Sequence, residues 1–202
     1  MDKHYFVIVN YNSGSDLINC VESILYSDNI TPHIIIVDNA SRDGSLEECK
    51  SRFPKFTYIY NTHNIGFAAG ANIGTRYALE RSAVTVTYCN PDAILDTKCA
   101  DILTSTVEAQ KVDIASPLIY KHDSSTHWFS GGNISFFKMR ATHRNISKKQ
   151  SDKFLISTDY ITGCVMTVSA SVFEKISLFD EDFFLYYELL YFYIYEAHEA
   201  YL

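Results

Sequence analysis

Positive charge is scarce in this sequence of 202 residues, which has 17 Lys and Arg against 24 Asp and Glu and a net charge of −7. A nucleic-acid-binding protein normally has a basic balance, so this composition argues against one. Long apolar runs are also lacking. The longest, residues 183–195, has thirteen residues and includes Glu188, whereas a membrane-spanning helix needs ~20. The first residues lack the features of a signal peptide, and we expect a cytoplasmic protein.

The five cysteines lack the spacing of a zinc site or a disulfide framework. They are odd in number and widely separated, without a Cys-x-x-Cys pair: Cys20, Cys49, Cys89, Cys99 and Cys164. We therefore predict free thiols. His122 and His127 flank a short serine-rich segment, but without a third ligand they do not predict zinc.

Strand-like and helix-like segments alternate through the first half of the chain. Residues 5–9 form a continuous apolar run, typical of a strand buried on both faces, and we predict further strands over residues 33–37, 56–60 and 84–88. Segments whose apolar residues have helical spacing lie between these strands. One of them begins near Ser45, which with Glu48 matches a capping box at a helix start. This order predicts an α/β fold with a mainly parallel central sheet and helices on both faces. We expect one domain, whose first half comprises residues 1–95.

The second half, residues 96–202, is less regular. We expect a helix over about 97–110, short strands near 128–137 and 160–168, and a short helix over 171–176. The segment 138–153 contains six Lys or Arg and a single acid, Asp152. It is either a solvated flap or a contact for a membrane or lipid pyrophosphate. The second alternative would make the protein peripheral at the inner membrane face.

Polar residues follow each of the four predicted parallel strands. In such sheets, ligands bind beyond the carboxyl ends of the strands, so these residues are candidates for one binding rim, although each taken alone also suits a turn or helix cap. They are Asn10, Tyr11, Asn12, Asp38, Asn39, Asn61, Asn64, Asn90 and Asp92.

Two carboxylates stand out at this rim. Asp38 directly follows four apolar residues and can accept the imide N–H of a pyrimidine base. Asp92 follows Asn90 and Pro91, and its hard oxygen ligands would suit Mg²⁺ or Mn²⁺ carrying a diphosphate; an ordinary turn is the alternative. The glycine-rich segment 64–74 matches neither dinucleotide nor Walker A motifs. It predicts a helix start that favours a phosphate, or close packing of a helix on the sheet.

Several of these segments occur in an order typical of one enzyme family. With "VIVNYNS", "IIIVDNASRDGS", "NIGFAAGANIG", "NPDA" and "TGCVMTVSASVFEKISLFDEDFFLYYE", the sequence resembles family-2 inverting glycosyltransferases of the GT-A fold. The nearest likeness is to the rhamnosyltransferase-like branch of bacterial cell-surface polysaccharide synthesis, and it covers residues 5–188.

The resemblance implies a role for each candidate residue. Transfer would proceed with inversion from a nucleotide diphosphate sugar (dTDP-rhamnose or a UDP-sugar) to a saccharide or lipid-linked acceptor. Asp92 would hold Mg²⁺ or Mn²⁺ on the diphosphate. The donor pocket would be formed by Asn10, Tyr11, Asn12, Asp38, Asn39, Asn64, Gly66, Gly70, Asn90 and Asp92. Trp128, Gly131 and Gly132 would border the acceptor side. Residues 1–95 would then be the nucleotide-binding half of the domain and residues 96–202 its acceptor-side half, shorter at the C-terminal end than is usual in the family.

The sequence departs from the family pattern near Glu188. Family members carry Glu-Asp there, with the Asp as catalytic base, whereas Leu189 follows Glu188 here. The chain also stops before the family's usual C-terminal helices. Four interpretations follow: Glu188 is the base of a short active transferase; the donor pocket persists without catalysis; the chain is truncated or altered near residue 188; or it is a scaffolding subunit whose aromatic tail binds a partner, including a second copy.

Overall fold

A six-stranded sheet forms the centre of the computed structural model, which describes residues 3–109, 112–122, 126–135, 137–138, 140–144 and 155–184. The sheet order is β3-β2-β1-β4-β10-β5. The strands are β1 (His4–Asn10), β2 (His33–Asp38), β3 (Thr57–Tyr60), β4 (Thr85–Cys89), β5 (Ile114–Ala115) and β10 (Val165–Ser169). β1 to β4 are parallel, and β10 runs antiparallel to both of its neighbours. The prediction of a mainly parallel sheet is confirmed.

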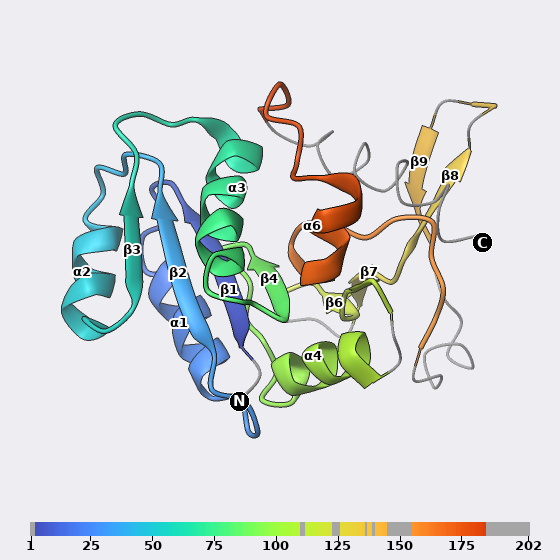
Figure 1. The fold of residues 1–202 in the computed structure, drawn as a ribbon, viewed down its shortest axis with the longest axis horizontal. Coiled ribbons are helices and arrows are strands. Elements are labelled where there is room, and N and C mark those ends of the chain that lie inside the picture. The colour runs from blue at the N-terminus through green and yellow to red at the C-terminus, as the bar shows by residue number, and fades with distance from the viewer. Residues whose placement is uncertain are drawn as a thin grey trace.

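Helices cover both faces of this sheet, as predicted (Figure 1). Side chains alternate across a strand, so Tyr5 and Val7 of β1 join one hydrophobic core while Phe6 and Ile8 join the other. The first core includes α3 (Gly66–Leu79) and α6 (Ala170–Ile176). The second includes α1 (Asp16–Leu25), α2 (Ser45–Arg52) and α4 (Cys99–Ala109).

Helix α3 lies close against the sheet because two of its positions are glycine. A Cβ added at Gly70 would lie 2.9 Å from Val9 Cγ1, and one at Gly74 would collide with Val7. The expected close packing of a small-residue helix face on the sheet is therefore present.

The predicted capping box at Ser45 is wrong. The residue at the cap of α2 is Gly44, with φ of 80° and no side-chain capping bond, and Ser45 is already helical. The Ser45 hydroxyl instead donates to Asp43 Oδ1 at 2.7 Å. Glycine accepts this backbone conformation at little steric cost, so the helix begins from a turn that side-chain spacing alone does not reveal.

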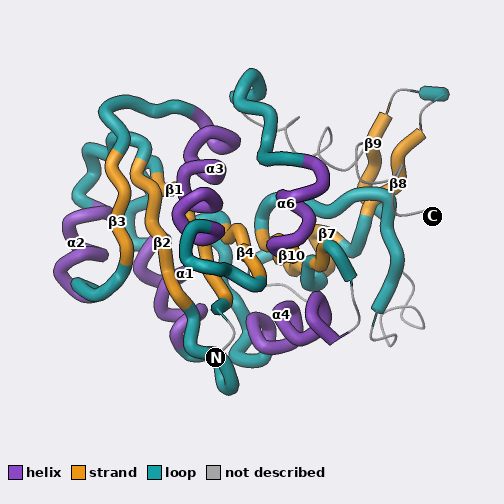
Figure 2. Tube along the Cα trace, in the orientation of Figure 1, coloured by secondary structure: helices purple, strands orange, loops and turns teal. Residues whose placement is uncertain are grey.

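The second half adds two small antiparallel pairs beside the main sheet (Figure 2). One joins β6 (Ile119–Tyr120) to β7 (His127–Phe129), and the other joins β8 (Gly132–Ser135) to β9 (Arg140–His143). Among the described residues, no helix is long and apolar enough to cross a membrane.

Candidate active site

The carboxyl ends of β1 and β2 bring Asn10 and Asp38 side by side. The two residues are register partners, and Asn10 Nδ2 donates to Asp38 Oδ1 at 2.7 Å. Ser41 completes the pair: its hydroxyl donates to Oδ1 at 2.6 Å and its amide to Oδ2 at 3.0 Å. Asp38 is only 4% exposed, so these neutral donors stabilise a carboxylate whose burial would otherwise be costly.

A second set of contacts joins the loops after β1 and β2. Arg42 N donates to Asn12 Oδ1 at 2.8 Å, and Gly14 N donates to Asp43 Oδ2 at 2.7 Å. Burial favours a higher pKa for Asp43, but the hydrogen bonds from Ser45 and Gly14 outweigh it and hold the pKa below its usual value. Tyr11, at the tip of the first loop, is 51% exposed. The two loops thus form one braced rim with an open aromatic ring.

The Asn39 side chain is occupied by the protein itself. Its Nδ2 donates to Asn64 Oδ1 at 3.2 Å and to the Gly66 carbonyl at 3.0 Å. Its Oδ1 accepts from Asn61 Nδ2 at 2.9 Å. Asn39 and Asn64 therefore lie together at the rim, as predicted from their positions after β2 and β3, but the bonds of Asn39 fix the start of α3.

The first amides of α3 already have acceptors. Gly66 N donates to Asn64 Oδ1 at 3.0 Å, and Phe67 N donates to the Phe184 carbonyl at 3.0 Å. Gly66 has φ of 85°, and a Cβ there would lie 2.6 Å from that carbonyl oxygen. The absence of a side chain at Gly66 therefore lets the Phe184 backbone pack against the start of α3. A phosphate at this helix start would have to compete with protein acceptors.

The turn after β4 presents Asp92 on the surface. The turn is fixed at its base, because Asn90 N donates to the Cys164 carbonyl at 2.8 Å and Ala93 N to the Asn90 carbonyl at 3.0 Å. Asp92 itself is exposed. Burial, together with the negative charge of Asp92, raises the pKa of the Cys164 thiol to about 12. β1 pairs with both β2 and β4, so the Asn10, Asp38 and Asn90 positions end three neighbouring strands.

A divalent ion at this turn would rely on few protein ligands. No group of three or more His, Cys, Asp or Glu in the described ranges has the arrangement of a metal site. Mg²⁺ commonly binds through one or two carboxylates and takes its other ligands from substrate phosphates and water. An exposed Asp92 on a braced turn fits that mode of binding.

The cysteines are free thiols, as predicted.

The predicted acceptor-side residues lie at the base of the β8–β9 hairpin. Trp128 is 42% exposed and meets His143 edge-on, with 5.4 Å between ring centroids. Gly131 has φ of 99°, and a Cβ there would lie 2.7 Å from an Arg144 side-chain nitrogen. Gly132 lies against the Tyr160 ring. The two glycines are buried packing positions, while the Trp128 ring remains accessible.

Glu188 and the aromatic tail lie outside the described residues, as does most of the basic segment 138–153. The described chain reaches Phe184 at the donor edge through contacts that the sequence did not predict. Asn72 of α3 is buried, and its side chain bonds both the amide and the carbonyl of Phe179. A polar residue within a helix face of small residues was the signal that could have indicated such a contact.

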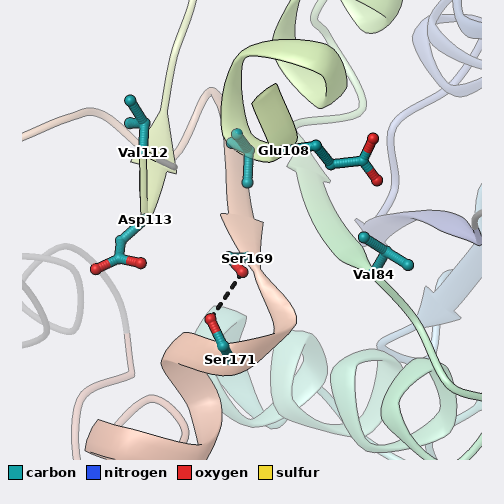
Figure 3. Close-up of a pocket in the computed structure, with 7 residues that line it drawn as sticks. Val84, Glu108, Val112, Asp113, Ser169 and Ser171 are labelled. Atoms are coloured by element: carbon teal, nitrogen blue, oxygen red, sulfur yellow. Dashed lines mark hydrogen bonds between the residues drawn. The ribbon is translucent and has the colours of Figure 1, made fainter. Parts of the chain in front are cut away.

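A separate cavity of about 350 Å³ lies at the amino end of β4, away from this rim (Figure 3). It includes none of the predicted site residues. Its lining is Val84, Val107, Glu108, Val112, Asp113, Ser169 and Ser171.

Solved structures of nucleotide-sugar enzymes share this arrangement of strands and helices. S. aureus TarS superposes with a TM-score of 0.69 at 12% identity, over 94% of this chain and 32% of TarS. The mannosyltransferase PcManGT from Pyrobaculum calidifontis gives 0.62 at 18% identity, over 89% of this chain and 48% of that protein. The fold is therefore GT-A, as predicted.

The family follows from the sequence profile described as glycosyl transferase family 2, which matches residues 5–177. The chain belongs to this family. It is 27% identical over 190 residues to the low-salt glycan biosynthesis hexosyltransferase Agl10 of Haloferax volcanii, covering 93% of this chain. It is also 27% identical over 183 residues to the dTDP-rhamnosyl transferase RfbF of Shigella flexneri, covering 91%. The chain spans 59% of the length of each of these relatives.

Proposed function

We propose that this chain binds a nucleotide diphosphate sugar at the Asn10–Asp38 rim and transfers the sugar, with inversion, to a saccharide or lipid-linked acceptor. The observation that carries the proposal is the meeting of three neighbouring strand ends: Asp38, a buried and hydrogen-bonded carboxylate, ends β2 on one side of β1, and the exposed Asp92 follows β4 on the other side. The family relationship supports it. A dTDP-rhamnose donor is favoured by the likeness to RfbF. A UDP-sugar is favoured by TarS, which has been solved with UDP and with UDP-GlcNAc.

In this mechanism Asp38 recognises the base. The carboxylate accepts three hydrogen bonds from Asn10 and Ser41, and a carboxylate has about four acceptor positions. The remaining position on Oδ2 suits the imide N–H that uracil and thymine share. Tyr11, whose ring is half exposed, would stack against the base. Asn39 and Asn64 hold the rim in shape through their mutual bond.

Asp92 would hold Mg²⁺ or Mn²⁺ against the diphosphate, and PcManGT, with a similar fold, has been solved with GDP-Man and Mn²⁺. The bound ion would offset the charge of the departing nucleoside diphosphate. The rigid turn at Asn90 and Pro91 keeps the Asp92 carboxylate in place before the ion binds, so less ordering accompanies binding.

Glu188 is the proposed general base, which removes the proton of the acceptor hydroxyl as that oxygen attacks the anomeric carbon. A single in-line displacement inverts the configuration at that carbon. Glu188 follows Phe184 by four residues in the sequence, and Phe184 is bonded to the start of α3 at the donor edge. Trp128 would offer a ring face to the acceptor sugar.

Thermal unfolding with UDP, dTDP and GDP, with and without Mn²⁺, tests donor binding. A nucleotide at a hundred times its Kd should raise Tm by about 5–10 °C, and Mn²⁺ should increase the shift. Failure of every nucleotide to stabilise the chain contradicts the proposal. Turnover of donor by wild type and by Glu188→Gln then tests the base. Equal rates would show that Glu188 is not the base, and binding without turnover would favour a donor-binding subunit.

A further inference from the structure

The β8–β9 hairpin ends in an aromatic side chain that the described chain leaves almost fully uncovered. Phe137 is 97% exposed, more than any other large hydrophobic residue among those described. Its neighbour Lys138 is exposed too, and Lys138 N donates to Ser135 Oγ at 3.3 Å across the turn. In Figure 1 the end of this hairpin projects beyond the body of the molecule, at the upper right.

The charge around this hairpin is opposite to that of the whole protein. Among the described residues, the hairpin and the residue that follows it carry three cations, Lys138, Arg140 and Arg144, and in the sequence no acidic residue occurs between Asp123 and Asp152. All four β9 side chains, including that of Arg140, are exposed. One acid lies beside the hairpin, Asp159, whose carboxylate accepts the Ile134 N–H at 3.0 Å. A local excess of cations on a protein of net charge −7 indicates an anionic partner.

We propose that the end of the β8–β9 hairpin binds an anionic lipid membrane, with Phe137 in the interfacial layer and Lys138 and Arg140 on lipid phosphates. Aromatic and aliphatic side chains flanked by Lys and Arg suit the boundary between headgroups and acyl chains, where one end is apolar and the other wet. A purely electrostatic partner would use the cations but would leave the Phe137 ring in water. The combination therefore favours a lipid surface.

The position of the hairpin gives this contact a role. Its first strand begins at Gly132, and His143 of β9 contacts the Trp128 ring. Docking of Phe137 would thus hold the Trp128 side of the molecule near the bilayer, where the sugar of a lipid-linked acceptor is presented. This consequence rests on the proposed function; binding of the hairpin to lipid does not.

Co-sedimentation of the whole chain with vesicles tests the contact directly. We expect binding to phosphatidylcholine vesicles that contain about one third phosphatidylglycerol, and much weaker binding to phosphatidylcholine alone. Phe137→Ser should weaken binding by roughly tenfold or more, because an apolar ring is no longer removed from water. Lys138→Gln should weaken it by about fivefold, and high salt should abolish this second effect.

Two variants on the far part of the fold serve as controls. Tyr26→Ser removes an aromatic ring that is 70% exposed at the end of α1, and Lys55→Gln removes one exposed charge before β3. Both should bind vesicles as wild type does. The proposal is overturned if wild type ignores anionic vesicles or if Phe137→Ser and Tyr26→Ser behave alike. It is also overturned if sedimentation velocity shows that Phe137→Ser dissociates a dimer, since a second copy would then be the partner.

The outcome is separable from the donor site. Phe137→Ser should keep the Tm shift produced by nucleotide and Mn²⁺, because the hairpin end lies outside the rim. Loss of vesicle binding with the nucleotide shift intact would support the hairpin contact. Vesicle binding by a chain that no nucleotide stabilises would contradict the proposed function alone.

Discussion

Asn72 and Phe179, 107 residues apart in the sequence, are joined by a reciprocal pair of hydrogen bonds. Asn72 Nδ2 donates to the Phe179 carbonyl at 2.8 Å, and the Phe179 amide donates to Asn72 Oδ1 at 3.0 Å. The side chain thus satisfies both backbone groups of Phe179, as a neighbouring strand would. Asn72 Nδ2 also reaches Glu181 Oε1 at 2.9 Å. Helix α3 therefore fixes the segment that leads toward Glu188.

Asn72→Ala should separate positioning from donor binding. The change leaves the Phe179 amide and carbonyl without their partner, which costs about 2–4 kcal/mol in free energy of unfolding. Misplacement of the segment after Phe179, which leads toward Glu188, should lower kcat by about tenfold to hundredfold. The Kd for UDP, measured by calorimetry well below Tm, should stay within twofold of wild type.

Arg76→Ala is the matched control, because Arg76 lies one turn further along α3 and pairs with Glu181 at 3.2 Å in solvent. Exposed pairs of this kind contribute about 0–1 kcal/mol, so this variant should resemble wild type. If Asn72→Ala weakened nucleotide binding as much as it lowered kcat, Asn72 would belong to the donor pocket instead.

Gly66→Ala should disturb the same segment from the other side. The new methyl group would lie 2.6 Å from the Phe184 carbonyl oxygen, and the residue would also have to adopt φ of 85°. Gly44→Ala isolates the second effect, because Gly44 has φ of 80° but nothing within 4 Å of the added atom. The backbone term costs about 1–2 kcal/mol at either site. Chemical denaturation should find Gly66→Ala less stable than Gly44→Ala, and equal losses would mean that Phe184 does not press on this position.

The sequence allowed the main sheet to be predicted because its signal is local. Short runs rich in apolar and β-branched residues predict strands, and the runs at residues 5–9, 33–37 and 84–88 all fall within β1, β2 and β4 or extend them by one residue. The insertion of β10 between β4 and β5 was not predictable in this way. Its pairing with β4 is antiparallel and joins residues about 80 apart in the sequence, for example Val165 with Cys89, and no short pattern encodes that choice.

The candidate site, too, was predictable from the sequence only in part. The rule that parallel strands end at a common edge correctly placed Asn10 beside Asp38. The rule does not reveal which side chains remain free to bind a ligand, because that depends on contacts between loops. Asn39, one residue after the end of β2, was predicted to bind the donor, yet all its side-chain groups bond to Asn61, Asn64 and Gly66, and the Asn10 amide likewise donates to Asp38, Ser41 and Ser45. Sequence position alone cannot distinguish a binding amide from a bracing one.

Two partly buried cysteine thiols should make the fold less stable at alkaline pH. Burial raises the pKa of Cys164 to about 12 and that of Cys99 to about 11, from an ordinary value of 9.0. The folded chain thus holds these protons more tightly than the unfolded chain. The resulting stability is fully present below pH 9 and is lost as pH rises through 11 to 12. Urea midpoints measured from pH 8 upward should fall, and Cys164→Ala with Cys99→Ala should flatten the decline.

The charges of Asp92 and Asp96 can be followed through the reactivity of two cysteine thiols. The charge of Asp92 contributes to the raised pKa of Cys164, after burial, whereas Asp96 does the same for Cys99. Asp92→Asn should therefore speed alkylation of Cys164 by iodoacetamide at alkaline pH and leave Cys99 unchanged, and Asp96→Asn should do the reverse. Mass spectrometry of the two peptides gives both rates in one sample.

The same pair of variants measures whether Asp92 binds the ion. In wild type, Mn²⁺ should increase the Tm shift that UDP produces, because under the proposed function Asp92 would hold the ion that offsets the charge of the diphosphate. Asp92→Asn should lose this increase and keep the smaller shift from UDP alone, since Asp38 and its hydrogen bonds remain. Asp96 lies four residues after Asp92, and its exposed carboxylate accepts a hydrogen bond from Lys98 N. The Asp96→Asn variant should respond to Mn²⁺ as wild type does. An undiminished Mn²⁺ response in Asp92→Asn would place the ion on other ligands and remove Asp92 from the proposed mechanism.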